Sequence, residues 1–148
     1  MNGAVSCKVL AVDHGDARIG IAISDESASL ARAHSIIKHV ARAKDAEKVL
    51  EIASSEGCSA IVVGIPYDSD GSIGPRARKV MRFVDVLKDL SELPVYVWDE
   101  SGSTKSLEAI SIMVGDSARK RRQASDDRVA ALILQDYLDA KARSGLNE

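Results

Sequence analysis

Residues 9–24 read VLAVDHGDARIGIAIS, and this stretch predicts the start of a β-sheet. Residues 8–12 are a continuous β-branched and apolar run, and residues 18–24 show the alternation of a strand. The segment HGDA between them holds the Gly and Asp residues that a tight connection needs. Residues 32–38 are a weaker third candidate. We therefore expect three antiparallel strands at the start of the chain, with Asp13 at the end of the first.

The rest of the chain alternates between helical and extended patterns. The expected elements are a helix around 46–53 with Gly57 as its C-cap, a strand at 59–66, a helix from Pro75, a strand at 94–100, a helix from Ser103 or Thr104 to Gly115, and a helix from near Ser125 to about Lys141. This order predicts an α/β fold with a mixed five-stranded sheet: three antiparallel strands come first, then αβ units, with helices on both faces.

Length and composition are those of an ordinary globular protein. The 148 residues are 45% hydrophobic and 28% charged, which predicts a single domain over residues 1–148. No stretch approaches the roughly 20 apolar residues of a membrane span or has the form of a signal peptide. Cys7 and Cys58 lack the spacing of a zinc site, so we interpret them as reduced thiols of a cytoplasmic protein.

Acidic residues stand where strands end or a helix begins: Asp13, Asp99-Glu100 and Asp126-Asp127. Converging carboxylates in an apolar setting repel one another unless a cation meets them, and Mg²⁺ or Mn²⁺ prefers oxygen ligands. This layout predicts a metal site. Taken singly, each acid also suits a structural role, such as an Asx turn at Asp13 or an N-cap at Ser125-Asp126. Both Asp126 and Asp127 fall on the apolar face of the last helix, so helix geometry does not choose between them.

The three histidines, His14, His34 and His39, have no spacing typical of metal ligands, and we interpret all three as structural. A formal net charge of −2 gives no global attraction to nucleic acid. Any polyanion must therefore be held by local basic residues or through bound metal. The candidates are Arg119, Lys120, Arg121 and Arg122, aided by Arg18 and Arg76. The run 119–122 equally suits a solvated loop.

Four blocks of the sequence together resemble the bacterial YqgF family, also known as RuvX-like. They are VLAVDHGDARIGIAISD, VVGIPYDSDGSIGPRARKV, VYVWDE and DDRVAALILQDYLD. They are similar to that family's D-x-G-x-x-R-I-G-x-A-x-S-D, V-G-x-P-x-x-x-D-G-x-x-G-P-x-A, W-D-E and D-x-x-A-A-x-x-L-Q-x-Y-L motifs, in the same order over nearly the whole chain.

The resemblance implies a ribonuclease H-like fold and an acidic constellation at Asp13, Glu100 and Asp127. The D-x-x-A-A spacing selects Asp127, which the helix pattern left open. One departure is that Ser101-Gly102 stands where the family commonly has Arg-Leu. The loop after Glu100 therefore lacks a cation that could contact substrate phosphate.

The activity implied by the resemblance is metal-dependent hydrolysis of phosphodiester bonds in 5′-end maturation of pre-16S rRNA. Two Mg²⁺ or Mn²⁺ ions about 3.5 to 4 Å apart would suffice without a covalent nucleophile. One alternative is cleavage of branched DNA as a Holliday junction resolvase. Symmetric junction cleavage requires two active sites, so a strict monomer would count against it, and the sequence leaves monomer and homodimer open. Nucleotide phosphotransfer is another, since D-x-G also occurs in actin and sugar kinases, although no Walker A motif is present. The last alternative is a non-catalytic RNA-binding factor.

Overall fold

The computed structural model describes residues 7–100 and 126–144, with side chains at all of these except 126, 127 and 144. The elements are β1 (Val9–His14), β2 (Arg18–Ser24), β3 (Ala31–Lys38), α1 (Arg42–Glu56), β4 (Ala60–Ile65), α2 (Pro75–Leu90), β5 (Val95–Asp99) and α5 (Asp126–Ser144). Each matches an element predicted from the sequence, with ends that differ by a few residues. The helix expected between Ser103 or Thr104 and Gly115 lies outside the described residues.

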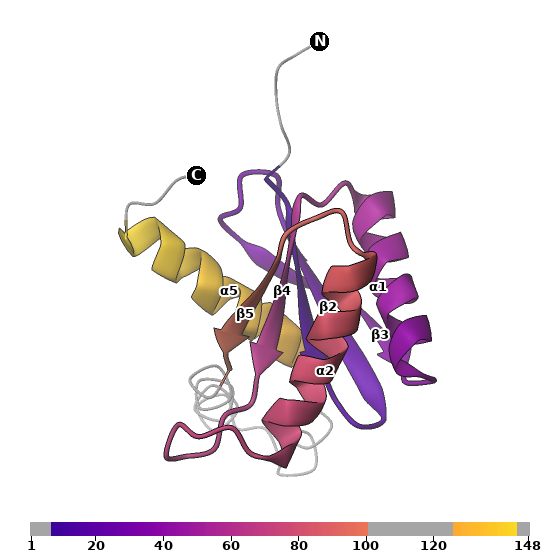
Figure 1. Ribbon diagram of the computed structural model, residues 1–148. Helices are drawn as coiled ribbons and strands as arrows, with labels where there is room; N and C mark the ends of the chain where they lie inside the picture. Colours follow the sequence, from indigo (N-terminus) through magenta and orange to yellow (C-terminus); the bar gives the residue numbers. More distant parts are fainter. Residues whose placement is uncertain (1–6, 101–125, 145–148) are drawn as a thin grey trace, which may run out of the picture.

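The five strands form one mixed sheet in the order β3-β2-β1-β4-β5 (Figure 1). The β1–β2 and β2–β3 pairs are antiparallel, and β4 and β5 run parallel to β1 and to each other. The predicted antiparallel start followed by αβ units is therefore confirmed. Because β1, β4 and β5 are parallel, their carboxyl ends meet at one edge of the sheet.

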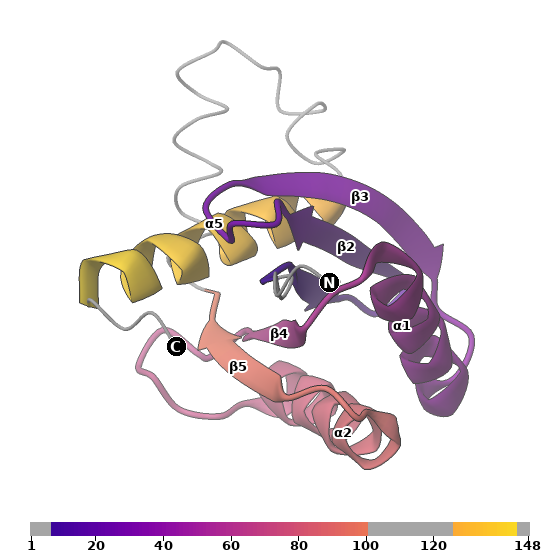
Figure 2. The ribbon, with the colours of Figure 1, turned by 90° about the horizontal axis from the view of Figure 1, so that it is seen from above.

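Helices cover both faces of the sheet: α1 and α2 lie on one side and α5 lies on the other (Figure 2). Along β1, Leu10 and Val12 belong to the core under α1 and α2, whereas Val9 and Ala11 belong to the core under α5. Successive side chains of a strand point to opposite faces. The same alternation places Asp13 on the α5 face and His14 on the face of α1 and α2.

Helix α5 packs on the sheet through a row of apolar residues. Ala130, Leu134, Tyr137 and Leu138 cluster with Val9, Ala11, Ala22 and Val62. The Gln135 side chain adds a polar anchor: its Oε1 accepts from the backbone N–H of Ala31 at 2.9 Å, and its Nε2 donates to the carbonyl of Ser29 at 2.9 Å. These contacts fix the rotation of α5. Within the described ranges, no helix is long and apolar enough to cross a membrane.

Asp25 organises the connection from β2 to β3. Its Oδ1 accepts from the backbone N–H groups of Ser29 at 2.8 Å and Leu30 at 3.2 Å. These bonds hold the chain through Ala28, whose φ of 57° is left-handed. The backbone bonds from Ser29 and Leu30 stabilise the charged carboxylate and lower its pKa to about 2.

We predict that the stabilisation from Asp25 is lost in acid. Its folded pKa of about 2 lies below the ordinary value of 3.8. The contribution is therefore fully present above about pH 4 and disappears as the pH falls through about 2. Replacing Asp25→Ala should lower the urea midpoint of unfolding at pH 7, and the gap to the native chain should narrow towards pH 2. A gap that stays constant across this range would contradict the role.

Candidate active site

Asp13 lies at the carboxyl end of β1, on the α5 face of the sheet. It is half-buried and stands opposite Gly20 of β2 in the antiparallel register. On the other side of β1, Val12 is in register with Val63 of β4. Asp13 is therefore level with Gly64, at the strand spacing of about 4.8 Å.

Glu100 follows β5, which lies on the other side of β4 from β1, and its side chain reaches Gly64 from that side. Its backbone N–H donates to the carbonyl of Ile65 at 3.2 Å, which extends the pairing of β5 with β4 by one residue. Its side chain lies over Gly64, where an added Cβ would be 2.8 Å from Glu100 Oε1 and 2.7 Å from Ile133 Cδ1. Glycine at position 64 thus makes the space that the carboxylate occupies beneath α5. Asp13 and Glu100 thus both lie on the α5 face, Asp13 level with Gly64 and the Glu100 carboxylate over it.

The Glu100 side chain is buried, with an exposed fraction of 7%. Burial raises the pKa of its carboxyl group, while Arg76 opposes the rise and Asp99 adds to it. Loss of water is thus the dominant effect, and it disfavours the charged form. A divalent cation beside Glu100 and Asp13 would offset that cost. The donor set is all oxygen, which suits a hard ion such as Mg²⁺ or Mn²⁺.

Asp127 is the second residue of α5. Its helix position is three residues before Ala130 and seven before Leu134, both of which pack on the sheet. The contact of Ile133 at Gly64 shows that the amino-terminal half of α5 lies over the carboxyl ends of β1 and β4. The helix thus begins near the edge that carries Asp13 and Glu100. The participation of the Asp127 side chain stays a prediction.

Two of the predicted substrate-binding cations lie at this edge. Arg18 is exposed and begins β2, where its carbonyl accepts from the N–H of Gly15 in the β1–β2 turn at 2.9 Å. Arg76 is exposed in the first turn of α2 and is close enough to affect the pKa of both Glu100 and Asp16. Arg119, Lys120, Arg121 and Arg122 lie outside the described residues.

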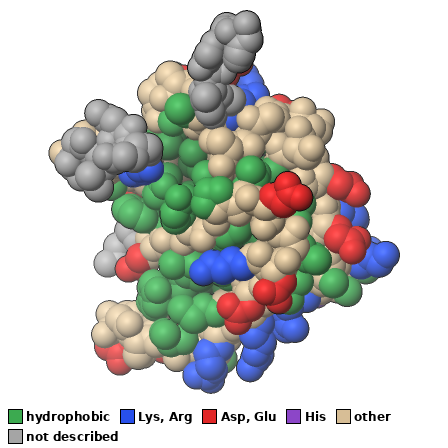
Figure 3. All heavy atoms as spheres, turned by 45° about the horizontal axis from the view of Figure 1, so that its top comes forward, with side chains coloured by type: hydrophobic (Ala, Val, Ile, Leu, Met, Phe, Trp, Pro, Cys, Tyr) green, Lys and Arg blue, Asp and Glu red, His purple; other side chains and the backbone are tan. Residues whose placement is uncertain are grey.

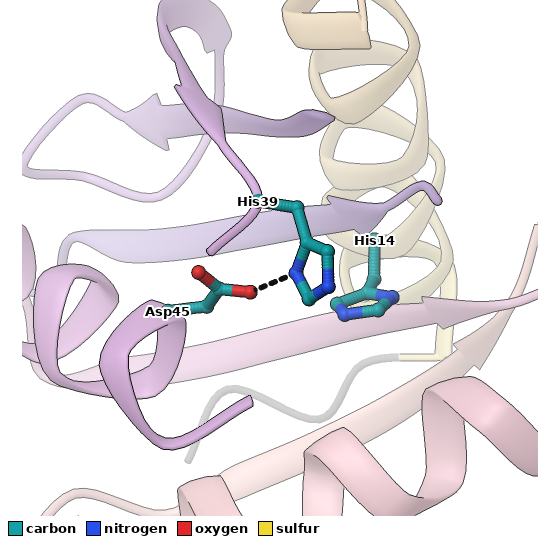
Figure 4. A group of neighbouring side chains, drawn as sticks. All are labelled: His14, His39 and Asp45. Atoms are coloured by element: carbon teal, nitrogen blue, oxygen red, sulfur yellow. Dashed lines mark hydrogen bonds and ion pairs between the residues drawn. The ribbon is translucent and has the colours of Figure 1, made fainter. Parts of the chain in front are cut away.

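The structure also brings together three side chains that sequence reasoning did not connect: His14, His39 and Asp45 (Figure 4). They come from β1, the residue after β3, and the first turn of α1. One potential ligand atom of each lies within 4.8 Å of the others. Burial, and then the neighbouring His39, lower the pKa of His14. No local spacing could have indicated this group, because strand pairing assembles it.

Comparisons with known proteins agree with this architecture. The family model described as RuvX, Holliday junction resolvase, matches residues 7–140. A protein of Thermoanaerobacter pseudethanolicus named "Putative pre-16S rRNA nuclease" is 38% identical over 90% of this chain and 97% of its own. A Halothermothrix orenii protein of the same name is 38% identical over 89% of this chain and 94% of its own.

Solved structures are similar in fold at low sequence identity. RuvC of Thermus thermophilus in complex with a Holliday junction substrate aligns with a TM-score of 0.58 at 18% identity, covering 94% of this chain and 96% of that one. The Holliday junction resolvase of fowlpox virus aligns with a TM-score of 0.52 at 16% identity, covering 90% and 99%. The ribonuclease H-like fold is confirmed, and the match over residues 7–140 shows that the chain belongs to the RuvX family.

Proposed function

We propose that this protein is a cytoplasmic, single-domain, metal-dependent nuclease that hydrolyses phosphodiester bonds in the precursor of 16S rRNA. The observation that carries the proposal is that Asp13 lies level with Gly64 and the Glu100 carboxylate lies over Gly64, under the helix that begins with Asp126-Asp127. The substrate is inferred from the names of relatives that share 38% of their residues with this chain.

Asp13, Glu100 and Asp127 would hold Mg²⁺ or Mn²⁺. The bound metal supplies a Lewis acid that activates water at neutral pH and stabilises negative charge on the phosphate. Asp13 is positioned by a strand that is paired on both sides, and Glu100 is held by its bond to Ile65 and by contact with Gly64. A carboxylate fixed in this way loses little free energy to reorganisation during the reaction.

The cations of the same edge would bind the phosphates on either side of the scissile bond. Arg18 and Arg76 stand at this edge, and the run 119–122 precedes Asp127 in the sequence. On the face of the molecule drawn in Figure 3, Lys and Arg side chains are interspersed with Asp and Glu. Substrate binding therefore depends on local cations at the site, and it should weaken as salt rises.

Branched DNA is the second candidate substrate. The description of the matched family names a Holliday junction resolvase, and RuvC of Thermus thermophilus was solved with such a junction. Symmetric junction cleavage requires two active sites and hence a dimer. The RNA substrate is favoured because the relatives that are 38% identical over about 90% of this chain carry its name.

The first test is the substitution Asp13→Asn. It removes a charged ligand at nearly constant volume, so cleavage with Mg²⁺ or Mn²⁺ should be lost while the circular dichroism spectrum is kept. Asp85→Asn, at an exposed position of α2, is the matched control and should cleave normally. Structured pre-rRNA, single-stranded RNA and a four-way DNA junction should each be tried with metal and with EDTA. Full activity of Asp13→Asn would refute the acidic site, and exclusive cleavage of the junction would replace the RNA proposal.

The second test is Gly64→Ala. The added methyl group would overlap Ile133 Cδ1 and Glu100 Oε1, at 2.7 and 2.8 Å. We expect a loss of stability of about 1–3 kcal/mol from overpacking. Displacement of Glu100 should lower the cleavage rate by about 100-fold.

Adding Ile133→Val to Gly64→Ala removes one of the two overlaps. This pair should recover part of the stability without recovering cleavage, because Glu100 remains displaced. If stability and cleavage recover to the same degree, Gly64 serves packing alone.

A further inference from the structure

His14, His39 and Asp45 lie together on the opposite face of the sheet from Asp13 and Glu100. His14 ends β1 and pairs with Ile19, while β3 pairs with the start of β2 through Lys38 and Arg18. The backbone N–H of His39 then donates to the carbonyl of Ala17 at 2.9 Å. The ends of β1 and β3 are thereby held on either side of β2, and the imidazoles of His14 and His39 lie edge to face, with ring centroids 6.2 Å apart.

Asp45 completes the group from α1. Its side chain is fully buried. Oδ1 accepts from the backbone N–H of Val40 at 3.0 Å, and Oδ2 is hydrogen-bonded to Nδ1 of His39 (Figure 4). The first bond fixes the carboxylate so that its second oxygen is presented to the histidines.

We propose that His14, His39 and Asp45 form a binding site for one divalent transition-metal ion, with zinc as its best match, separate from the acidic site. Zinc bonds to nitrogen and oxygen are about 2.0–2.2 Å long, so two ligand atoms of a tetrahedral ion lie roughly 3.3–3.6 Å apart. The three ligand atoms here lie within 4.8 Å of one another. Side-chain shifts of up to about 1 Å bring them to the spacing of one tetrahedral ion.

The chemistry of the ligands separates this site from the acidic one. Imidazole nitrogen is preferred by zinc and by other late transition metals, whereas Mg²⁺ prefers oxygen. Two imidazoles and one carboxylate leave a fourth position of a tetrahedral ion for water. Asp13 and His14 are adjacent in the chain, but the alternation of β1 sends them to opposite faces, so the two groups do not share a ligand.

The surroundings of the group permit an ion to enter and remain. The His39 side chain is one-third exposed, which gives access from solvent, while His14 packs on Phe83 of α2 with ring centroids 4.6 Å apart. Lys79 is the nearby cation that acts on His14, and its Nζ is engaged by Asp16 at 2.8 Å. A bound ion would tie β1, the end of β3 and α1 together.

Zinc titration of the purified full chain by calorimetry tests the proposal, after EDTA treatment and dialysis. The Asp13→Asn variant is titrated in parallel, because it weakens the acidic site without touching the proposed ligands. Both proteins should bind one equivalent of zinc and should unfold at a higher temperature when it is present. His39→Asn and His14→Asn should each weaken binding by more than about tenfold. His34→Asn, on the exposed side of β3, is the matched control and should bind like the native chain.

A measurement on the native sequence covers the case in which a histidine variant does not fold. In protein labelled with ¹⁵N-histidine, zinc should shift the ring signals of His14 and His39 and leave those of His34 in place. The proposal is overturned if the native chain takes up no zinc at one equivalent, if zinc shifts no ring signal of His14 or His39, or if Asp13→Asn abolishes binding. Loss of cleavage activity alone leaves this result unaffected, so the two proposals fail independently.

Discussion

The alternation of side chains along β1 is the constraint on which the other features depend. This strand is paired with β2 on one side and with β4 on the other, so its register is fixed from both directions. A slip of one residue would exchange its two faces. Asp13 would then move under α1 and α2, and His14 would move under α5. The pairing of β1 therefore keeps the carboxylate of Asp13 and the imidazole of His14 on opposite faces of the sheet.

Gly64 links this strand to the helix on the α5 face. Because it has no side chain, Glu100 and Ile133 both approach the β4 backbone, and the carboxylate comes beside the position of Asp13. The cost of burying Glu100 appears as a raised pKa of its carboxyl group. A cation shared with Asp13 would offset the free-energy cost of burying the Glu100 carboxylate. Gly64 thus makes room both for Ile133 of α5 and for the Glu100 carboxylate.

Sequence patterns predicted the sheet because the strands and turns are local signals, and α5 because Ala130, Leu134 and Leu138 repeat at helical spacing. They did not decide between neighbouring acids. The resemblance chose Glu100 over Asp99, and the structure finds Glu100 buried and Asp99 exposed. The resemblance also selects Asp127 over Asp126, and that selection remains a prediction. The interpretation of the histidines as structural missed the approach of His39 to His14 and Asp45, because that approach depends on how β3 pairs with β2, which no local spacing reports.

The central claim is that one divalent ion is shared by carboxylates carried on separate elements of the fold. The most direct measurement is an anomalous-difference map from crystals of the protein grown with Mn²⁺. The account predicts a peak on the α5 face of the sheet beside Gly64, at coordination distance, about 2.1 Å, from oxygens of both Asp13 and Glu100. Mn²⁺ bound elsewhere, with these two carboxylates contacting no common ion, would contradict it.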